Sequence, residues 1–422
     1  ETGGGAFGPW LRFAGYDGIV LEDSSEEPIW ISIINGEVKF HRASELWGKG
    51  VIYTEHRIRE ILGKREGEGS ILSIGPAGEN KSLISAIMND KYRAAGRTGL
   101  AAVLGAKKIK AIYVYGENRP EVVDKEKFEE LNKELAKKIM DDPVSKTLHQ
   151  YGTAALVNVI NSVGAFPTRN WSDAVFENAY EISGEKLAET YLVDRVGCWG
   201  CVIKCSRVST VPSGPYYTPR SEGPEYESVW ALASLTGIND WAPVIKMNYL
   251  ANDLGFDTIS LGNTLATAID LVKRGLVPKE LINGLDIKWD NADALIELMY
   301  RMAMRVDEFA SVAADGAPVL AEKFGAPDVA VHVRGLELPA YDPRGIKGMA
   351  LAYATSNRGG CHLRAYPVAV EVLGHAGGKD IKLDPLAVVD EKASIIKDMQ
   401  DYFAIVDSLV VCKFVTFATA PE

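Results

Sequence analysis

The sequence predicts an α+β protein, in which a β-rich first domain is followed by two mainly α-helical domains. Strand-like segments fill roughly the first 118 residues, and apolar residues at helical spacing begin after Asp124. A length of 422 residues suits two or three domains, and 47% hydrophobic residues are typical of a soluble globular chain. We therefore place the domains at 1–119, 120–330 and 331–422.

The β-rich part is defined by short apolar runs that end in turns. Asn35 and Gly36 supply the two positive-φ positions of a type I′ turn, so the segments beside them should form a hairpin. A helix is expected over 52–62, and glycine loops over 75–80 and 93–99. The expected strands are 18–21, 30–34, 38–40, 71–74 and 109–115.

The later part of the chain shows apolar residues three and four positions apart, which is the helical spacing. Asp124 and Asp240 are placed to cap helix starts, and Gly255 would end the second of these helices in a left-handed conformation. One helix begins after Asp124, and the others are expected over 183–193, 227–236, 240–254, 259–273, 292–312 and 389–412.

Charge and hydropathy exclude several classes of partner. The chain carries 46 basic and 57 acidic residues, a net charge of −11, and its one lysine cluster lies at 107–110, so nucleic acid is not an expected partner. The most apolar window, 403–420, contains Asp407 and Lys413 and does not read as a membrane span. An acidic chain with clustered thiols and no secretory signal suits a reducing cytoplasm.

Three of the five cysteines, Cys198, Cys201 and Cys205, form a C-x2-C-x3-C pattern. Thiolates bind soft metals, and three in one short loop make a partial cage that needs a fourth ligand. Cys412 is the candidate for that ligand. The pattern favours an iron–sulfur cluster, most simply [4Fe–4S], because a cluster of this kind takes four thiolates.

Three other interpretations of this cysteine pattern stay open. A four-thiolate zinc site usually pairs two C-x2-C knuckles, and the chain has no second knuckle. The iron–sulfur signature of radical enzymes has the reverse spacing. A disulfide is less expected, because a chain of this size can bury a sufficient core without one.

Four further segments carry side chains that could bind a ligand or take part in catalysis. For each of them a purely structural role is also open. Arginines at 93–97 could bind a phosphate or lie in a surface turn. Carboxylates at 225–227 could cap a helix or act as acid–base groups. Cys361 and His362, after two glycines, could pack in the core or approach a ligand. The segments 252–257 and 407–412 are similar to each other, and a helix C-cap would explain the first.

Taken together, these segments resemble the tungsten-containing aldehyde ferredoxin oxidoreductases, and the resemblance covers essentially the whole chain. It rests on ordered matches at 13–17, 75–80, 93–97, 198–205, 222–230, 338–345 and 357–362.

The resemblance implies a β-sheet domain that grips a tungsten ion, or molybdenum in its place, held by the dithiolenes of two pterins. No protein side chain is required as a metal ligand there. A magnesium ion between the pterin phosphates is a further expectation. The [4Fe–4S] cluster would be bound by Cys198, Cys201, Cys205 and Cys412. Contacts to the pterins are implied for Arg93, Ala94, Gly96, Arg97, Asn252, Gly255, Phe256, Asp257, Arg364, Asp407 and Val411.

The implied reaction is the oxidation of small aldehydes to carboxylic acids with water. Glu227 and His362 match the family's acid–base pair, with His362 on the aldehyde oxygen and Glu227 taking protons from water or the hydrated substrate. Ferredoxin would accept the electrons, and the protein could form a homo-oligomer. Two alternatives are a related enzyme of the benzoyl-CoA reductase type and a non-catalytic iron–sulfur electron-transfer subunit.

Three departures from the family pattern are visible. Asn252 stands where the family's first pterin motif begins with Asp, and Val410 stands where the second motif has Gly. Family members are also longer at both ends, and this chain opens without Met, so we expect a fragment that could bind its cofactors poorly.

Overall fold

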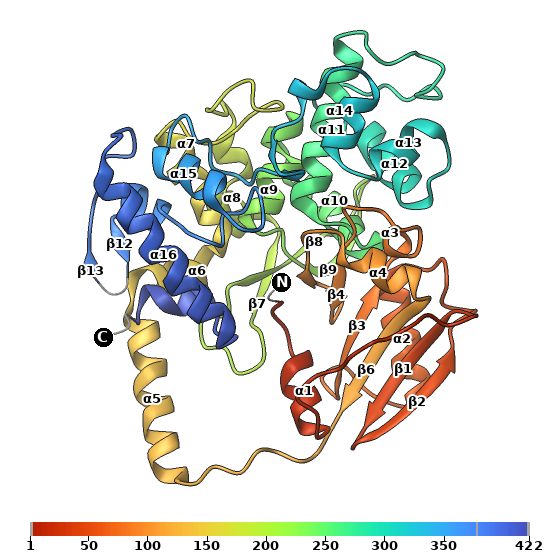
Figure 1. Ribbon diagram of the computed structural model, residues 1–422, viewed down its shortest axis with the longest axis vertical. Coiled ribbons are helices and arrows are strands. Elements are labelled where there is room, and N and C mark those ends of the chain that lie inside the picture. Colours follow the sequence, from red (N-terminus) through yellow and green to blue (C-terminus); the bar gives the residue numbers. More distant parts are fainter. Residues whose placement is uncertain (1–2, 377–378, 420–422) are drawn as a thin grey trace.

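The computed structural model describes residues 3–376 and 379–419 and confirms the α+β prediction, with a sheet domain beside a larger helical part (Figure 1). The sheet has six strands in the order β2-β1-β6-β3-β4-β5. Its first two strands form the expected hairpin, in which Asn35 and Gly36 have φ of 48° and 85°. The strands are β1 (Ile29–Ile34), β2 (Glu37–Arg42), β3 (Ser70–Ile74), β4 (Ile87–Asn89), β5 (Arg93–Ala95) and β6 (Ile109–Tyr115).

Alternate residues of the central strands point to opposite faces of the sheet, and each face is covered by different helices. Tyr113 packs towards α2 (Val51–Leu62), whereas Val114 packs towards α1 (Phe7–Phe13) and α4 (Leu100–Ala106). Burial on both faces explains why β6 reads as a nearly continuous apolar run in the sequence.

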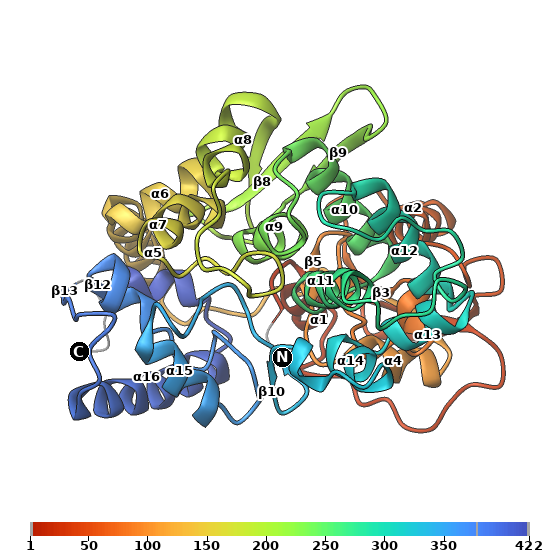
Figure 2. The same cartoon turned by 90° about the horizontal axis from the view of Figure 1, so that it is seen from above.

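The helical part has its core around α9 (Tyr226–Leu232), α10 (Trp241–Leu254) and α11 (Thr258–Lys273). Gly262 lets α11 approach α9 closely, because a Cβ at this position would lie 2.3 Å from the Ala231 carbonyl oxygen. Seen from above in Figure 2, these three helices lie in the middle, with α13 and α14 to one side and α15 and α16 to the other.

The other helices and strands are α3 (Pro76–Glu79), α6 (Pro143–Tyr151), α7 (Leu156–Ser162), α8 (Gly184–Thr190), α12 (Ala292–Met304), α13 (Glu308–Ala313), α14 (Ala317–Lys323), α15 (Lys347–Thr355), α16 (Asp390–Ser408), β10 (His332–Val333), β11 (Leu336–Glu337), β12 (His375–Ala376) and β13 (Lys379–Asp380). Within the described parts of the chain, no helix has the length and apolar character that a membrane crossing requires.

Five sequence expectations were wrong. The helix expected over 183–193 ends at Thr190, before β7, and the helix expected over 227–236 ends at Leu232. Residues 18–21 form no strand. The helix expected over 292–312 is split into α12 and α13, because Arg305 adopts a left-handed φ of 50°. The last helix ends at Ser408 rather than 412, and Val410 follows it with a φ of 55°.

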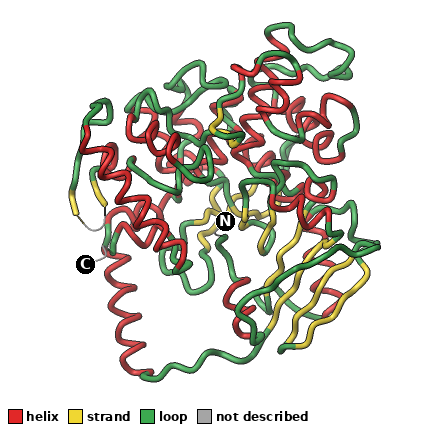
Figure 3. Tube along the Cα trace, viewed as in Figure 1, coloured by secondary structure: helices red, strands yellow, loops and turns green. Residues whose placement is uncertain are grey.

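A three-stranded sheet inside the helical part was not expected (Figure 3). It consists of β7 (Leu192–Val196), β8 (Ser206–Val211) and β9 (Thr218–Glu222). The loop that contains Cys198, Cys201 and Cys205 joins β7 to β8, so an antiparallel strand pair holds both ends of the cysteine loop.

The helix predicted after Asp124 is α5 (Lys125–Asp141), and the Asp124 side chain caps it by accepting a hydrogen bond from the Lys127 amide. It projects from the molecule after the extended link 116–124 (Figure 1). Only Ile139 of its apolar stripe is buried, whereas Phe128 is 50% exposed. The periodicity therefore predicted the helix but not its packing. The domain boundaries at 119 and 330 stay predictions.

Candidate functional site

The residues of the segment 252–257, named here the first loop, are held against the sheet domain. Gly255 ends α10 with a φ of 79°, and a Cβ there would lie 2.8 Å from the Gly75 backbone nitrogen. The Ala86 amide donates to the Gly255 carbonyl at 2.8 Å, and the Asp257 amide donates to the Ile84 carbonyl at 2.9 Å. Gly255, Phe256 and Asn252 are buried, so the first loop is part of the contact between the two domains.

Arg97 and Asp257 form a buried ion pair in this contact, with 3.3 Å between Nε and Oδ2. The Arg97 guanidinium also donates to the Gly360 carbonyl at 2.6 Å and to the Glu337 carbonyl at 2.7 Å. Asp257 caps α11 by accepting from the Ile259 and Ser260 amides. Both residues were expected to contact a pterin, which stays a prediction, and the structure shows that they join separate segments of the protein.

Arg93 lies in the edge strand β5 and faces the β7-β8-β9 sheet. Its Nη2 is 2.8 Å from Glu222 Oε2 at the end of β9. Burial lowers the pKa of Arg93, but Glu222 and the nearby Cys198, Glu225 and Cys205 raise it, and the net shift is upward. Arg93 therefore lies between the sheet domain and the cysteine loop.

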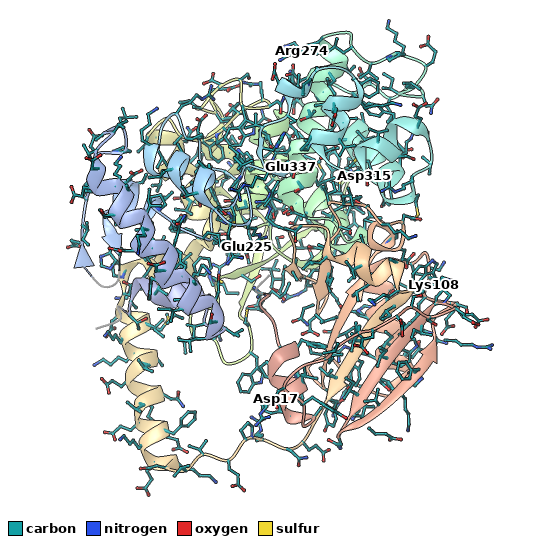
Figure 4. The ribbon with its side chains drawn as sticks, viewed as in Figure 1. Asp17, Lys108, Glu225, Arg274, Asp315 and Glu337 are labelled. Atoms are coloured by element: carbon teal, nitrogen blue, oxygen red, sulfur yellow. The ribbon has the colours of Figure 1, made fainter. Side chains whose placement is uncertain are left out.

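The carboxylates at the start of α9 do not cap it through their side chains. Glu225, labelled near the centre of Figure 4, accepts a hydrogen bond from the Thr153 hydroxyl at 2.5 Å, and burial raises its pKa. Glu227 Oε2 accepts from the Ala340 amide at 2.9 Å. Glu225 is the N-cap residue of α9 and Glu227 lies in its first turn, so both carboxyl groups stand near the helix N-terminus although neither makes a capping hydrogen bond.

Glu227 and His362 meet in a buried site, with 3.6 Å between Oε1 and Nε2. Burial raises the pKa of Glu227 to about 8, although the Ala340 amide and Arg97 act in the opposite direction. Burial, with smaller contributions from Arg97, Arg358 and Lys413, lowers the pKa of His362 to about 3. Near neutral pH the pair is therefore mainly a protonated carboxyl group and a neutral imidazole.

Two polar atoms of this pair have no hydrogen-bond partner within the described residues. They are Glu227 Oε1 and His362 Nδ1, and both are buried. Buried polar atoms are nearly always satisfied in folded proteins, so two unsatisfied atoms in one place indicate a position for a ligand.

The segment 407–412, named here the second loop, begins with the last two residues of α16 and is held by ion pairs of Asp407. Arg364 Nη1 is 2.5 Å from Asp407 Oδ2, and Lys413 Nζ contacts Asp407 Oδ1. Val411, which was expected to contact a pterin, is exposed, as is Cys412 overall. Lys413, which follows the second loop, also contributes to lowering the pKa of His362, after burial, Arg97 and Arg358.

The four cysteines predicted to bind the cluster come together. Burial raises the pKa of the Cys205 thiol, and Cys412 and Cys198 add to the effect. Burial also raises the pKa of Cys412, where Cys201 and Cys198 contribute. All five cysteines are free thiols, so the disulfide interpretation finds no support.

The spacing of these thiols differs from that of a single-ion site. Across residues 3–376 and 379–419, no three Cys, His, Asp or Glu side chains are grouped closely enough to hold one metal ion. Zinc holds four ligands at about 2.0–2.3 Å from one ion, which requires close sulfur atoms. In a [4Fe–4S] cube each thiolate binds a different iron, so the sulfur atoms stand farther apart.

Sequence reasoning missed three groups of this site. Glu222 pairs with Arg93, the Ala340 amide holds Glu227, and Lys413 pairs with Asp407. Lys413 follows Cys412 directly, and Glu222 and Ala340 lie within the matched segments 222–230 and 338–345, so all three carried a positional signal. Of the predicted residues, Ala94 is exposed on β5 and Gly96 follows that strand.

Comparisons with known proteins agree with these motifs. Residues 1–116 match the family model "Aldehyde ferredoxin oxidoreductase, N-terminal domain", and residues 130–422 match "Aldehyde ferredoxin oxidoreductase, domains 2 & 3". The chain is 45% identical to the tungsten-containing aldehyde ferredoxin oxidoreductase of Pyrococcus horikoshii and 44% identical to that of Pyrococcus furiosus. Each match covers 99% of this chain and 68% of the relative.

Two more distant similarities extend the comparison. An aliphatic sulfonate oxidoreductase, WOR-like subunit, of Pyrococcus furiosus is 30% identical over 96% of this chain and 64% of the relative. The active site complex BamBC of benzoyl coenzyme A reductase, in complex with 1,5 dienoyl-CoA, aligns with a TM-score of 0.77 at 19% identity, over 99% of this chain and 68% of that one. The latter similarity shows a shared fold alone. From the two family models and the 45% identity, the chain belongs to the aldehyde ferredoxin oxidoreductases, a family of oxidoreductases.

Proposed function

We propose that this protein oxidises aldehydes to carboxylic acids with water at a tungsten bis-pterin centre and passes the electrons through a [4Fe–4S] cluster to ferredoxin. The buried Glu227–His362 pair carries this proposal, because each partner keeps one buried polar atom free for a ligand. The names of the 44–45% identical relatives, which contain both tungsten and ferredoxin, support the choice of metal and of electron acceptor.

The residues present fit the proposed groups. Four thiols from the β7-β8 loop and from Cys412 suit a cubane cluster. Arginine binds phosphate through paired N–H groups, and Arg364 has a buried Nε without a hydrogen-bond partner in the described residues. Arg93 is the second candidate for a pterin phosphate, whereas Arg97 already donates to three protein acceptors.

The bound tungsten centre would supply a two-electron acceptor. One aldehyde and one water give one carboxylic acid, two electrons and two protons, so the protein must move two protons per turnover. The geometry supports a proton arrangement for this task. Glu227 Oε2 accepts from Ala340, so its proton lies on Oε1, the oxygen that has no partner and is left for a ligand. A neutral His362 with its proton on Nδ1, which also has no partner, would donate it to the aldehyde oxygen.

The ionised form of Glu227, which is the minor form near neutral pH, would be the general base for the attacking water or the hydrated substrate. With a pKa of about 8, its ionised form is a stronger base than an ordinary carboxylate. Burial keeps His362 neutral, which leaves it able to donate a hydrogen bond without placing a second cation beside Arg97.

The first test is anaerobic metal analysis of the protein together with kinetics of Glu227→Gln. About one tungsten and about four irons per chain are expected. With both metals retained, Glu227→Gln should lower kcat by a factor of about 10²–10⁴, because acid–base groups typically contribute that much. Near-normal turnover would contradict the role of Glu227. Iron without tungsten or molybdenum would favour an electron-transfer subunit, and zinc alone would contradict the cluster.

A further inference from the structure

Two arginines from the β7–β8 strand pair bind the carboxyl end of α6, and only one of them is buried. Arg207 Nη1 donates to the His149 carbonyl at 2.6 Å. Arg195 Nη2 donates to the Gln150 carbonyl at 3.4 Å. The two arginines are partners in the register of β7 and β8, but Arg207 is 2% exposed, whereas the Arg195 hydrogen bond is exposed to solvent. Capping the end of a helix therefore does not require a buried arginine.

Arg207 also binds the cysteine loop itself. Its Nη2 donates to the Lys204 carbonyl at 2.6 Å, and Lys204 directly precedes Cys205. Gly152, at the end of α6, leaves room for this contact. A Cβ there would lie 2.9 Å from the Cys205 carbonyl oxygen and 3.2 Å from Arg207 Cγ. The guanidinium therefore lies beside the backbone that carries Cys205.

The hydrogen bonds of Arg207 do not neutralise its charge. Both go to neutral carbonyl groups, and its buried Nε has no hydrogen-bond partner in residues 3–376 and 379–419. Burial lowers the pKa of Arg207, against smaller opposite effects of Glu225 and Cys205. Arginine keeps its proton in proteins, so a full positive charge is buried beside the cysteine loop, which is costly unless negative charge lies nearby.

Glu225 contributes negative charge to this region, but it acts on the cysteines as well as on Arg207. After burial, Glu225 is the largest contribution to the raised pKa of Cys205. On its own, this carboxylate would therefore disfavour negative charge at the Cys205 sulfur atom. The fixed charge of Arg207 acts in the opposite direction.

We propose that Arg207 is a fixed counter-charge for the iron–sulfur cluster at the cysteine loop and raises the reduction potential of that cluster. The inference rests on the proposed function, because it requires a [4Fe–4S] cluster bound by Cys205 and the three other predicted ligands. Reduction adds one electron, and so one negative charge, to the cluster. A buried cation nearby stabilises the reduced form more than the oxidised form. Arg207 keeps its proton throughout and acts on the reaction only through the cluster.

The test is a redox titration of the cofactor-loaded protein, followed by electron paramagnetic resonance of the reduced cluster. Arg207→Gln removes the charge and keeps an N–H donor for one carbonyl. Arg207→Lys keeps the charge and loses the planar fork. Arg195→Gln is the matched control, because it removes an arginine from the same helix end at the surface. Iron and tungsten per chain are measured for every variant.

We expect Arg207→Gln to favour the oxidised cluster about tenfold at a fixed potential, which lowers the midpoint potential by about 59 mV for a one-electron couple. Arg207→Lys should change this ratio by less than about twofold, because the charge is retained. Arg195→Gln should also change it by less than about twofold, because water and salt screen an exposed charge. If Arg207→Gln loses its iron and Arg207→Lys keeps it, the requirement for a charge is equally supported.

Several outcomes would overturn the proposal. They are an unchanged potential in Arg207→Gln, equal shifts in Arg207→Gln and Arg207→Lys, an equally large shift in Arg195→Gln, and loss of iron from Arg207→Lys. The last three would assign Arg207 a structural role at the end of α6. Absence of a reducible cluster in the unmodified protein would instead count against the proposed function.

Discussion

The first loop, 252–257, and the second loop, 407–412, each begin in the last residues of a helix, but the protein holds them by different means. The first loop is buried, with Gly255 against Gly75 and Asp257 paired with Arg97. The second loop is exposed at Leu409, Val410 and Val411 and is held by the charges around Asp407. The comparison teaches that similar motifs can serve unlike roles: the first loop joins domains, whereas the second depends on ion pairs that a ligand could rearrange.

Neutralising the aspartate of each loop should give the largest difference in stability between the two loops. Asp257→Asn keeps an oxygen for the α11 cap but leaves Arg97 buried without its partner charge, so we expect a loss of about 3–5 kcal/mol in the free energy of unfolding. Asp407→Asn should cost about 1 kcal/mol or less, because its ion pairs are partly exposed. Urea unfolding of both variants measures this, and equal losses would show that the loops are held alike.

Gly255→Ala tests the close approach of the first loop to the sheet domain. An alanine there must adopt a φ of 79°, and its Cβ would lie 2.8 Å from the Gly75 nitrogen. We expect a loss of about 3 kcal/mol, since neither backbone can move without breaking the domain contact. The control is Gly275→Ala, where the φ is 71° but no atom lies within 4 Å, so that only the conformational cost is paid. A similar loss in both variants would exclude the role of the Gly75 contact.

The pH dependence of the free energy of unfolding should report the raised pKa of Glu227. Burial raises the pKa of Glu227 from 4.5 to about 8, so the folded state binds this proton more tightly than the unfolded state. Its contribution to stability is therefore complete below about pH 4.5 and is lost as the pH rises towards 8. Unfolding curves of the protein and of Glu227→Gln between pH 5 and 9 should converge at low pH and separate at high pH, with the variant more stable. Parallel curves would contradict the raised pKa.

Val410→Gly should raise the free energy of unfolding, whereas Gly255→Ala should lower it. Val410 is a β-branched residue with a φ of 55° and is 73% exposed, so glycine would relieve backbone strain without removing buried contacts. We expect stabilisation of about 1 kcal/mol at most. Thermal unfolding is the measurement, and destabilisation would show that the valine side chain makes a contact that holds the second loop.

The smallest expected effect concerns the influence of Lys413, which follows the second loop, on the pKa of His362. Lys413 is one of three cations that lower the pKa of His362, after the larger effect of burial. Lys413→Met should therefore raise that pKa by less than about one unit, and the imidazole should stay neutral at pH 7. NMR titration of the histidine ring measures it, and no change would place Lys413 too far away to act.

The sequence predicted several parts of the fold because they depend on local rules. Asn35-Gly36 requires a type I′ turn, and Asp240 and Gly255 set the start and end of α10 as expected. The split between α12 and α13 could not be predicted, because Arg305 adopts a left-handed conformation that its type does not favour. The β7-β8-β9 sheet was missed because its strands are short and lie within a helical region.

The sequence by itself determined the chemical inventory of this protein: the C-x2-C-x3-C loop, Glu227, His362 and the arginines, through residue type and order. Only the tertiary structure decided how these groups behave. Burial gives Glu227 and His362 opposite pKa shifts, and the domain contact occupies Arg97 with protein acceptors. The physical reason is that residue type fixes which atoms can donate, accept or bind a metal. Desolvation and the nearest charges depend on segments that are far apart in the chain.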